Sequence, residues 1–212
     1  MLFSARQKVL FIGDSITDTG RRNPETPMGT GYAAMTANLI DARCAELELT
    51  WYNRGIGGDN VQSLCSRWQD DCLDLDCDWV SILVGVNDAH AFVAGNQEYS
   101  PENYRRVYRE LLDQVVSKTA GRLILWEPFY FVSRQTYDPR VAEVIDGYIQ
   151  VVHELGREFQ NRLVGVIRTQ KLFAEATQQR WLDFWMPDGV HPTPPGHALM
   201  ALEFLKLIGW QA

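Results

Sequence analysis

Ser15 follows directly on a segment with the pattern of a buried strand. The run Val9–Ile12 is apolar throughout, and Gly13 and Asp14 end it just before the serine. A hydroxyl at the carboxyl end of a buried strand lies where open α/β sheets bind ligands, and it could act there as a nucleophile. A helix beginning at Ser15 would also favour a developing negative charge. Alone, such a serine is more typical of a helix cap, so its chemistry depends on partners elsewhere.

Asp188 and His191 offer the partners that a nucleophilic serine needs. They stand three residues apart in the segment Met186–Pro192, which precedes the last helical pattern. One turn can hold both side chains, so that the carboxylate orients the imidazole while the imidazole takes the proton of Ser15. The alternative is an ordinary surface hydrogen bond between an aspartate and a histidine.

Two further segments could supply hydrogen-bond donors to an oxyanion. Gly55, Gly57 and Gly58 follow a second predicted strand, and the N–H of Gly58 is the candidate donor there. Asn87 ends a third strand and could add its side-chain amide beside the backbone N–H of Ser15. Donors from three strand ends would form a preorganised oxyanion hole. Each of these features alone also fits an ordinary turn between a strand and a helix. The segments do not match the dinucleotide-binding fingerprint, the phosphate-binding loop or the G-x-S-x-G nucleophile elbow.

Taken in order, these segments resemble the four sequence blocks of the SGNH hydrolases of the GDSL esterase superfamily. Those blocks centre on a serine in G-D-S, a glycine, an asparagine in G-x-N-D and a histidine in D-x-x-H. The matching residues here are Ser15, Gly58, Asn87, Asp188 and His191. Any one block is a weak signal, but four in the family's order, spanning nearly the whole chain, are a strong one.

The resemblance implies a serine esterase that works through an acyl-enzyme and needs neither cofactor nor metal. The catalytic residues would be Ser15, Asp188 and His191, with an oxyanion hole of Ser15, Gly58 and Asn87. Two positions depart from the family pattern. Ile16 replaces the usual leucine, which is a mild apolar change, and Asn60 stands where many members have threonine, which leaves the hydrogen bonding around the second block open.

Three stretches narrow the resemblance further. Phe11–Asp18, Gly29–Tyr32 and Trp126–Tyr130 are similar to small intracellular acetylxylan esterases. This similarity implies a small-molecule ester or acetylated oligosaccharide as substrate, with deacetylation of xylo-oligosaccharides or related carbohydrates as the reaction. The alternatives are a short-chain lipase, arylesterase or thioesterase of the same superfamily, and a non-catalytic carbohydrate-binding module. The presence of all four blocks disfavours the binding module.

Substrate contacts are expected at three residues near these blocks. Trp181 and Trp185 precede the Asp188 segment and could stack on a sugar ring, the alternative being aromatic residues of the core or of an interface. Asp14, next to the nucleophile, is the third candidate.

The elements that must position these residues alternate between strand and helix. Helices are expected to open at Ser100–Pro101, Asp138–Pro139 and Thr193–Pro194. Alternation of this kind predicts a single α/β domain over residues 1–212, a flavodoxin-like three-layer α/β/α sandwich with a five-stranded parallel sheet and right-handed crossovers. The predicted strands are Lys8–Ile12, Leu49–Asn53, Trp79–Val84, Arg122–Trp126 and Leu163–Ile167.

Composition limits the partners of the chain. Its 212 residues are 46% hydrophobic and carry a formal net charge of −7 without a basic run, which disfavours nucleic acid and anionic membranes as partners. No leader and no bilayer-spanning run is found, so a cytoplasmic protein is expected. The four cysteines form no C-x-x-C pair and the acidic stretch 70–78 departs from a calcium loop, so no metal site is expected. Seven tryptophans and eight tyrosines would allow a homo-oligomer interface.

Overall fold

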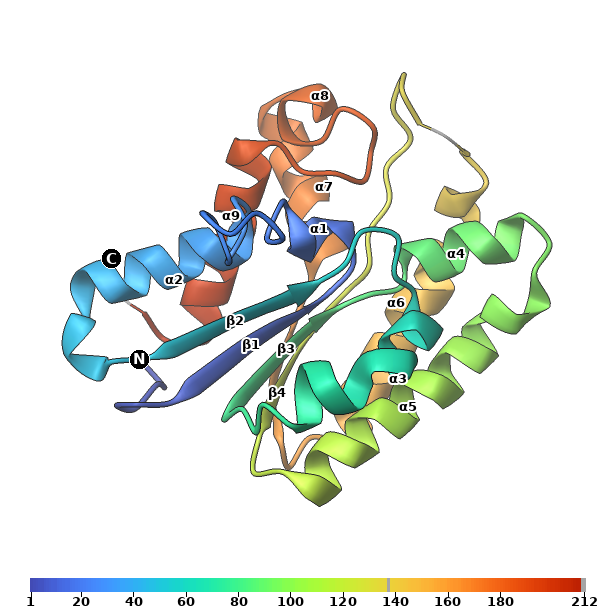
Figure 1. The fold of residues 1–212 in the computed structure, drawn as a ribbon. Coiled ribbons are helices and arrows are strands. Elements are labelled where there is room, and N and C mark those ends of the chain that lie inside the picture. The colour runs from blue at the N-terminus through green and yellow to red at the C-terminus, as the bar shows by residue number, and fades with distance from the viewer. Residues whose placement is uncertain (137, 211–212) are drawn as a thin grey trace.

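Five parallel strands form the centre of the computed structural model, which describes residues 1–136 and 138–210 (Figure 1). Their order is β2-β1-β3-β4-β5, the order of flavodoxin-like sheets. Each predicted strand is present, with ends that differ from the expectation by at most two residues. The strands are β1 (Lys8–Gly13), β2 (Thr50–Gly55), β3 (Trp79–Leu83), β4 (Arg122–Trp126) and β5 (Leu163–Ile167).

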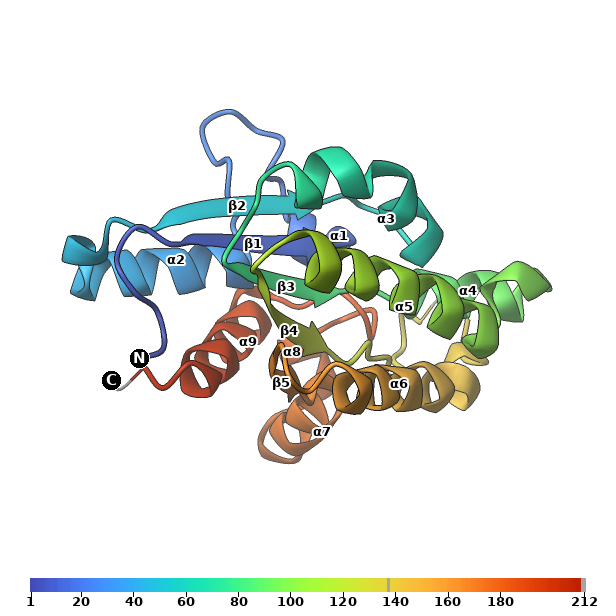
Figure 2. The same cartoon turned by 90° about the horizontal axis from the view of Figure 1, so that it is seen from below.

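Helices cover both faces of this sheet, which confirms the three-layer α/β/α fold. The α-helices are α1 (Ser15–Asp18), α2 (Tyr32–Arg43), α3 (Val61–Trp68), α4 (Val86–Val93), α5 (Pro101–Lys118), α6 (Val141–Glu158), α7 (Thr169–Gln179), α8 (Leu182–Trp185) and α9 (Pro194–Leu207). The other helical segments are the 3₁₀ turns η1 (Ala45–Leu47) and η3 (Gln97–Tyr99) and the π-helical segment η2 (Gln69–Leu73). In the view of Figure 2, α2 and α9 lie on one face of the sheet, and α3, α5 and α6 lie on the other.

Two of the three expected helix starts are confirmed. Ser100 caps α5 and Thr193 caps α9 through side-chain oxygens that accept backbone N–H groups, each followed by a proline at the first helical position. The third prediction is wrong by a few residues, because α6 begins only at Val141. The Asp138 carboxylate pairs with the side chain of Arg140 instead of capping a helix there.

The sheet register brings the carboxyl ends of three neighbouring strands, β2, β1 and β3, to one place. Gly13 at the end of β1 lies opposite Gly55 of β2 on one side and Leu83 of β3 on the other. The loops that leave these strands therefore begin side by side, although they come from distant parts of the sequence. This edge is where ligands bind in open α/β sheets.

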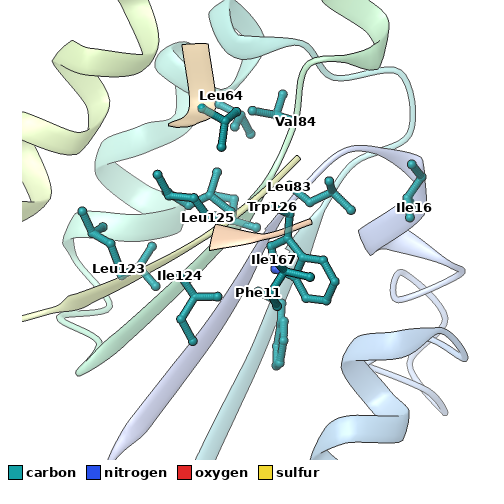
Figure 3. Packing of buried hydrophobic residues seen from close by; sticks show 14 of the residues in the cluster. Phe11, Ile16, Leu64, Leu83, Val84, Leu123, Ile124, Leu125, Trp126 and Ile167 are labelled. Atoms are coloured by element: carbon teal, nitrogen blue, oxygen red, sulfur yellow. The ribbon is translucent and has the colours of Figure 1, made fainter. Parts of the chain in front are cut away.

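The apolar core joins this edge to both helical layers (Figure 3). Phe11 of β1 and Leu125 of β4 are fully buried, and Ile16 carries the short helix α1 into the same core. Burial of one such aliphatic side chain contributes roughly 2 kcal/mol. Trp126 is buried as well, and its indole Nε1 donates to the Ser81 hydroxyl at 2.8 Å, so its polar atom is satisfied.

The three glycines after β2 meet different demands. A Cβ at Gly55 would lie 2.2 Å from the backbone nitrogen of Asp18, so this glycine permits close approach of α1 to the strand. Gly57 has ordinary space around it, and its N–H donates to the Asp18 carboxylate at 3.1 Å. Gly58 has a φ of +86°, in the left-handed region that favours glycine. The run therefore serves packing as well as any ligand.

Replacing Gly55 with alanine should strongly destabilise the fold, because neither α1 nor β2 can move without disturbing the core. Overpacking at a backbone contact of this kind costs about 2–4 kcal/mol. Urea unfolding would measure the loss, with Gly57→Ala as the matched control two residues away. We expect Gly57→Ala to stay within about 1 kcal/mol of the parent, and an equally small loss for Gly55→Ala would contradict this description of the packing.

Candidate active site

Ser15, His191 and Asp188 lie in one hydrogen-bonded line at the carboxyl edge of the sheet. The Ser15 Oγ is 2.9 Å from Nε2 of His191, and the other ring nitrogen, Nδ1, is 2.6 Å from Oδ2 of Asp188. Because an ionised carboxylate can only accept, Nδ1 carries the proton and Nε2 is left to accept the serine hydroxyl proton. The arrangement can activate Ser15 as a nucleophile.

The loop before α9 fixes both members of the Asp188–His191 pair. Oδ1 of Asp188 accepts the backbone N–H groups of Val190 at 2.9 Å and His191 at 2.7 Å, which leaves Oδ2 for the imidazole. Gly189 lies between them with a φ of +83°, and its carbonyl accepts the N–H of Phe131 at 3.0 Å. The loop is thereby tied to the segment that follows β4.

The charges of this pair reinforce one another. Hydrogen bonding and the negative charge of Asp188 raise the pKa of His191 above its usual 6.5, against the opposing effect of burial. Burial favours the neutral acid at Asp188, but the hydrogen bonds from the ring and backbone of His191 outweigh it and lower that pKa to about 2. Asp188 is therefore ionised throughout the pH range in which His191 titrates. A carboxylate that orients the histidine of a serine hydrolase must be ionised in this range.

The three expected oxyanion donors follow the strand ends at the edge of the sheet that carries Ser15. The backbone N–H of Ser15 is at the first position of α1, where it has no partner within the helix. Gly58 lies in the exposed loop after β2, and Asn87 lies at the start of α4, directly after β3. The structure thus brings the three residues to the same edge of the sheet.

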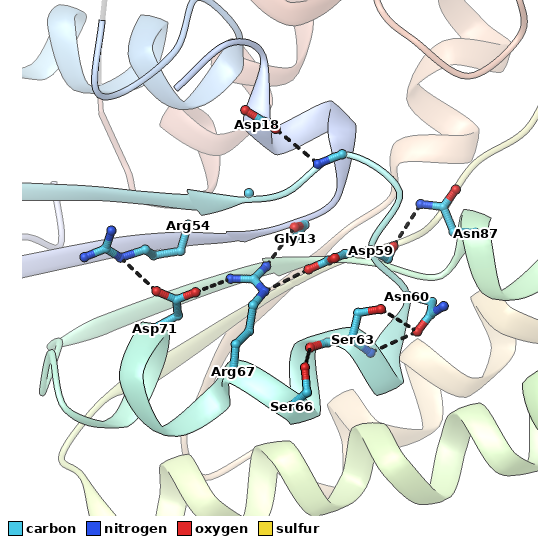
Figure 4. Close-up of polar contacts among 12 residues, drawn as sticks. Gly13, Asp18, Arg54, Asp59, Asn60, Ser63, Ser66, Arg67, Asp71 and Asn87 are labelled. Carbon is cyan, nitrogen blue, oxygen red and sulfur yellow. Dashed lines mark hydrogen bonds and ion pairs between the residues drawn. The ribbon is translucent and has the colours of Figure 1, made fainter. Parts of the chain in front are cut away.

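Asn87 and its neighbour Asp88 hold the end of the glycine loop where it enters α3, and Figure 4 shows the Asn87 contact. The side-chain amide of Asn87 donates to the backbone carbonyl of Asp59 at 2.8 Å, and its second hydrogen is left for a ligand. The buried carboxylate of Asp88 accepts the N–H of Val61 at 3.1 Å, at the start of α3. Asn60, which stands where many family members have threonine, caps the same helix by accepting the Ser63 N–H at 2.9 Å. This bond shows the hydrogen bonding that the sequence left open at this position.

A pocket of about 170 Å³ opens beside this group. The residues lining it are Asn87, His90, Tyr130, Gln135, Asp188, Val190 and His191. His90 and Tyr130 meet edge to face with ring centroids 5.3 Å apart. Burial lowers the pKa of His90, so this ring is neutral at physiological pH.

Sequence reasoning missed His90, Tyr130 and Gln135. His90 follows Asn87 by three residues on α4, and this spacing, which places two side chains on one helix face, could have revealed it. Tyr130 and Gln135 reach the pocket through the irregular segment after β4, where the similarity of Trp126–Tyr130 to acetylxylan esterases marks the stretch but assigns no contact to either residue.

The burial of Asp14 disfavours the expected substrate contact there. Only 1% of Asp14 is exposed, and its Oδ1 accepts the N–H of Ile16 at 3.0 Å, so it caps α1 beneath the nucleophile. Burial raises its pKa to about 7. Its role is therefore to hold the start of the helix that carries Ser15.

The two expected tryptophan contacts lie outside the described pocket. Trp185 is half-buried, donates from its indole nitrogen to the Ala176 carbonyl at 3.0 Å, and packs edge to face against Phe184. Trp181 is 65% exposed, and the guanidinium carbon of Arg180 is 4.9 Å from its ring centroid. A sugar-stacking role stays a prediction for Trp181 and is disfavoured for Trp185, whose ring is engaged in packing.

Residues 1–136 and 138–210 contain no group of three or more histidine, cysteine, aspartate or glutamate side chains suited to a metal ion. None of their helices combines the length and apolar character needed to cross a bilayer.

The sequence also matches known proteins along its length. Residues 11–199 match the model of the GDSL-like lipase/acylhydrolase family. An acetylxylan esterase from Geobacillus stearothermophilus is 34% identical over 221 residues, which cover 100% of this chain and 98% of the relative. The matched region includes all the residues proposed for catalysis and for the oxyanion hole, which are Ser15, Gly58, Asn87, Asp188 and His191.

Solved structures agree with the sequence matches. A GDSL-like lipase from Parabacteroides merdae superposes with a TM-score of 0.91 and 31% identity over 99% of both chains. The crystal structure of the acetylxylan esterase Axe2 from Geobacillus stearothermophilus gives a TM-score of 0.88 and 33% identity, covering 100% of this chain and 98% of Axe2. Catalytic mutants of Axe2 replace a serine, an aspartate and a histidine, the last two lying three positions apart as Asp188 and His191 do.

Replacing Asp188 with asparagine should lower kcat by about 10³- to 10⁴-fold, because the amide no longer fixes the tautomer of His191 or stabilises its cation. It should also change the pH dependence. His191 must be neutral to accept a proton, so kcat/KM of the parent rises as pH increases through its raised pKa. Without the Asp188 charge that pKa falls, and the acidic limb of the profile moves to lower pH.

Steady-state kinetics between pH 5 and 9 would measure both effects on the p-nitrophenyl acetate reaction. Asp183→Asn is the matched control, since Asp183 is an exposed carboxylate of α8 outside the pocket. An acidic limb that stays in place in Asp188→Asn would mean that another group sets the pKa of His191.

Proposed function

Since the chain belongs to the GDSL-like lipase/acylhydrolase family and is a carboxylic ester hydrolase, we propose that it deacetylates xylo-oligosaccharides or related acetylated carbohydrates through an acyl-enzyme on Ser15. The observation that carries this mechanism is the hydrogen-bonded line from the Ser15 hydroxyl through His191 to Asp188. A binding module would have no need to keep a serine, an imidazole and an ionised carboxylate in this order.

Acylation begins when the Ser15 oxygen attacks the ester carbonyl while Nε2 of His191 takes the hydroxyl proton. The tetrahedral intermediate places its negative oxygen among the N–H groups of Ser15 and Gly58 and the free amide hydrogen of Asn87. Preorganised donors of this kind usually supply the largest single share of the rate enhancement. His191, now a cation stabilised by Asp188, donates its proton to the leaving alcohol.

Deacylation repeats these steps with water as the nucleophile. His191 accepts a proton from water, the hydroxide attacks the acyl-serine carbonyl, and the same donors hold the second oxyanion. Collapse of that intermediate releases the carboxylic acid, and the proton on Nε2 returns to Ser15. The cycle consumes one water and needs no other reactant.

The size of the pocket supports a small acyl group. Its volume of about 170 Å³ lies below the roughly 300 Å³ at which pockets for drug-sized ligands begin. An acetyl group fits such a space, whereas each further methylene must find room against Tyr130 and Val190.

The polarity of the pocket supports a hydroxylated leaving group. Of the described residues lining it, six carry polar side chains and Val190 is aliphatic. His90 and Gln135 can donate or accept hydrogen bonds to the hydroxyls of a sugar, and Tyr130, whose hydroxyl donates to the Asp138 carbonyl at 2.9 Å, can accept one. The relative Axe2 is described as an acetyl-xylooligosaccharide esterase, which agrees with this chemistry.

A paired rate assay tests the proposal. It would measure acetate release from acetylated xylo-oligosaccharides beside hydrolysis of p-nitrophenyl esters with acyl chains of two to eight carbons. We expect rapid acetate release and a fall in kcat/KM of roughly tenfold or more between the two-carbon and six-carbon esters. Ser15→Ala should lower every rate by at least about 10³-fold.

Ser66→Ala is the matched control, because the Ser66 hydroxyl only donates to the Ser63 carbonyl on the exposed side of α3. Activity on nitrophenyl esters without acetate release from the sugar would keep the serine esterase and exclude the carbohydrate. A preference for the longer esters would favour the lipase alternative. Full activity in Ser15→Ala would overturn the nucleophile.

A further inference from the structure

Arg67 lies beneath the proposed oxyanion hole, on the inner side of α3 (Figure 4). It is absent from the expected catalytic residues and from the pocket lining. Its side chain is 14% exposed, and each of its three guanidinium nitrogens contacts a different segment. A guanidinium with all its nitrogens engaged is held in a single orientation, since its planar fork cannot rotate without losing contacts.

The first contact reaches the glycine loop. The Nε of Arg67 donates to Oδ2 of Asp59 at 2.8 Å, and Asp59 is the residue directly after Gly58. The same residue offers its backbone carbonyl to the Asn87 amide at 2.8 Å. Asp59 therefore links two of the three expected oxyanion donors, and Arg67 holds Asp59.

The second contact reaches the strand that carries the nucleophile. Nη2 of Arg67 donates to the carbonyl of Gly13 at 3.3 Å, two residues before Ser15. That carbonyl also accepts the N–H of Ile56 at 3.0 Å, so the end of β1 and the start of the glycine loop share one acceptor. Arg67 thus contacts the chain on both sides of the gap between the Ser15 and Gly58 N–H groups.

The third contact anchors the guanidinium itself. Nη1 donates to Oδ2 of Asp71 at 2.8 Å, one turn further along, and Arg54 approaches the other oxygen of Asp71 at 3.4 Å. These contacts place two carboxylates against two guanidinium groups. Removing Arg67 would leave the Asp59 carboxylate, which is 13% exposed, without its cation.

We propose that Arg67 is a positioning residue that sets the spacing of the three oxyanion donors through its contacts with Asp59 and the Gly13 carbonyl. It touches no substrate. Its effect rests on the proposed acyl-transfer function, because donor spacing matters most where charge develops in the transition state. Loss of Arg67 therefore lowers kcat while substrate binding changes little.

The test compares Arg67→Met with a control of similar structural cost. Arg162 is the matched residue, since its guanidinium also bridges backbone carbonyls, those of Thr119 and Gly121, at the opposite end of the sheet. Kinetics on p-nitrophenyl acetate and thermal unfolding would be measured for Arg67→Met and Arg162→Met. We expect Arg67→Met to lose about 10- to 100-fold in kcat with KM within about threefold, and Arg162→Met to keep kcat within about twofold.

A transition-state analogue separates positioning from general destabilisation. An alkyl trifluoromethyl ketone forms an adduct with the serine that carries an oxyanion, so its inhibition constant depends on the three donors. In Arg67→Met that constant should rise by about the same factor by which kcat falls. A merely structural role would lower the amount of active enzyme without changing the inhibition constant of the part that remains folded.

Two further variants, Asp59→Ala and Ser15→Ala, cover the cases in which Arg67→Met does not fold or the proposed function fails. If Arg67→Met does not fold, Asp59→Ala removes the same link from the other side and should show the same loss of kcat and of inhibitor binding. Unchanged kcat and inhibition constant in the variant that folds would overturn the role of Arg67. Ser15→Ala, measured alongside, distinguishes that result from failure of the proposed function, because only the latter leaves Ser15→Ala active.

Discussion

The candidate active site at the carboxyl edge of the sheet depends on one constraint, which is that β1, β2 and β3 end in register. Gly13 lies beside Gly55 on one side and Leu83 on the other, so three loops leave the sheet at the same level. Ser15, Gly58 and Asn87 follow within a few residues of those ends. A strand that is buried on both faces cannot slip by one residue along its neighbours without changing every pair of residues in the sheet. The register therefore fixes where the three strands end, and with it the spacing of the proposed oxyanion donors. The helical layers stabilise this register by burying the apolar side chains of the strands, and the loops carry the residues proposed for catalysis.

Buried polar groups hold the loops to this frame. Asp14 caps α1, Asp88 accepts the first N–H of α3, and burial raises the pKa of both to about 7. Arg67 and Asn87 join the glycine loop to β1 and α4. Buried carboxylates are costly unless they are hydrogen-bonded, so each one specifies a single position for the backbone that it binds. The proposed nucleophile and oxyanion donors are thus tied to the sheet by hydrogen bonds before a substrate arrives, as electrostatic stabilisation of a transition state requires.

Much of this could be predicted from the sequence, because the informative patterns are local. Apolar runs located the five strands, and the Asp188–His191 spacing predicted a hydrogen bond that the structure contains. Asp14 was assigned to substrate because it stands next to Ser15, whereas its burial depends on helix packing that spacing does not reveal. The start of α6 was misplaced because Asp138 finds a charged partner in Arg140. Tyr130 and Gln135 reach the pocket through an irregular segment, and the contact of Arg67 with the Gly13 carbonyl joins segments 54 positions apart in the chain.

The central claim is that Ser15 becomes acylated during turnover. The most direct measurement is mass spectrometry of the protein quenched with acid during reaction with p-nitrophenyl acetate, followed by digestion. Hydrolysis through Ser15 predicts a mass increase of one acetyl group on the peptide that contains Ser15, enriched in Asp188→Asn if deacylation slows more than acylation, and absent in Ser15→Ala. Turnover without an acetylated Ser15 peptide, or with the acetyl group on another residue, would contradict the assignment.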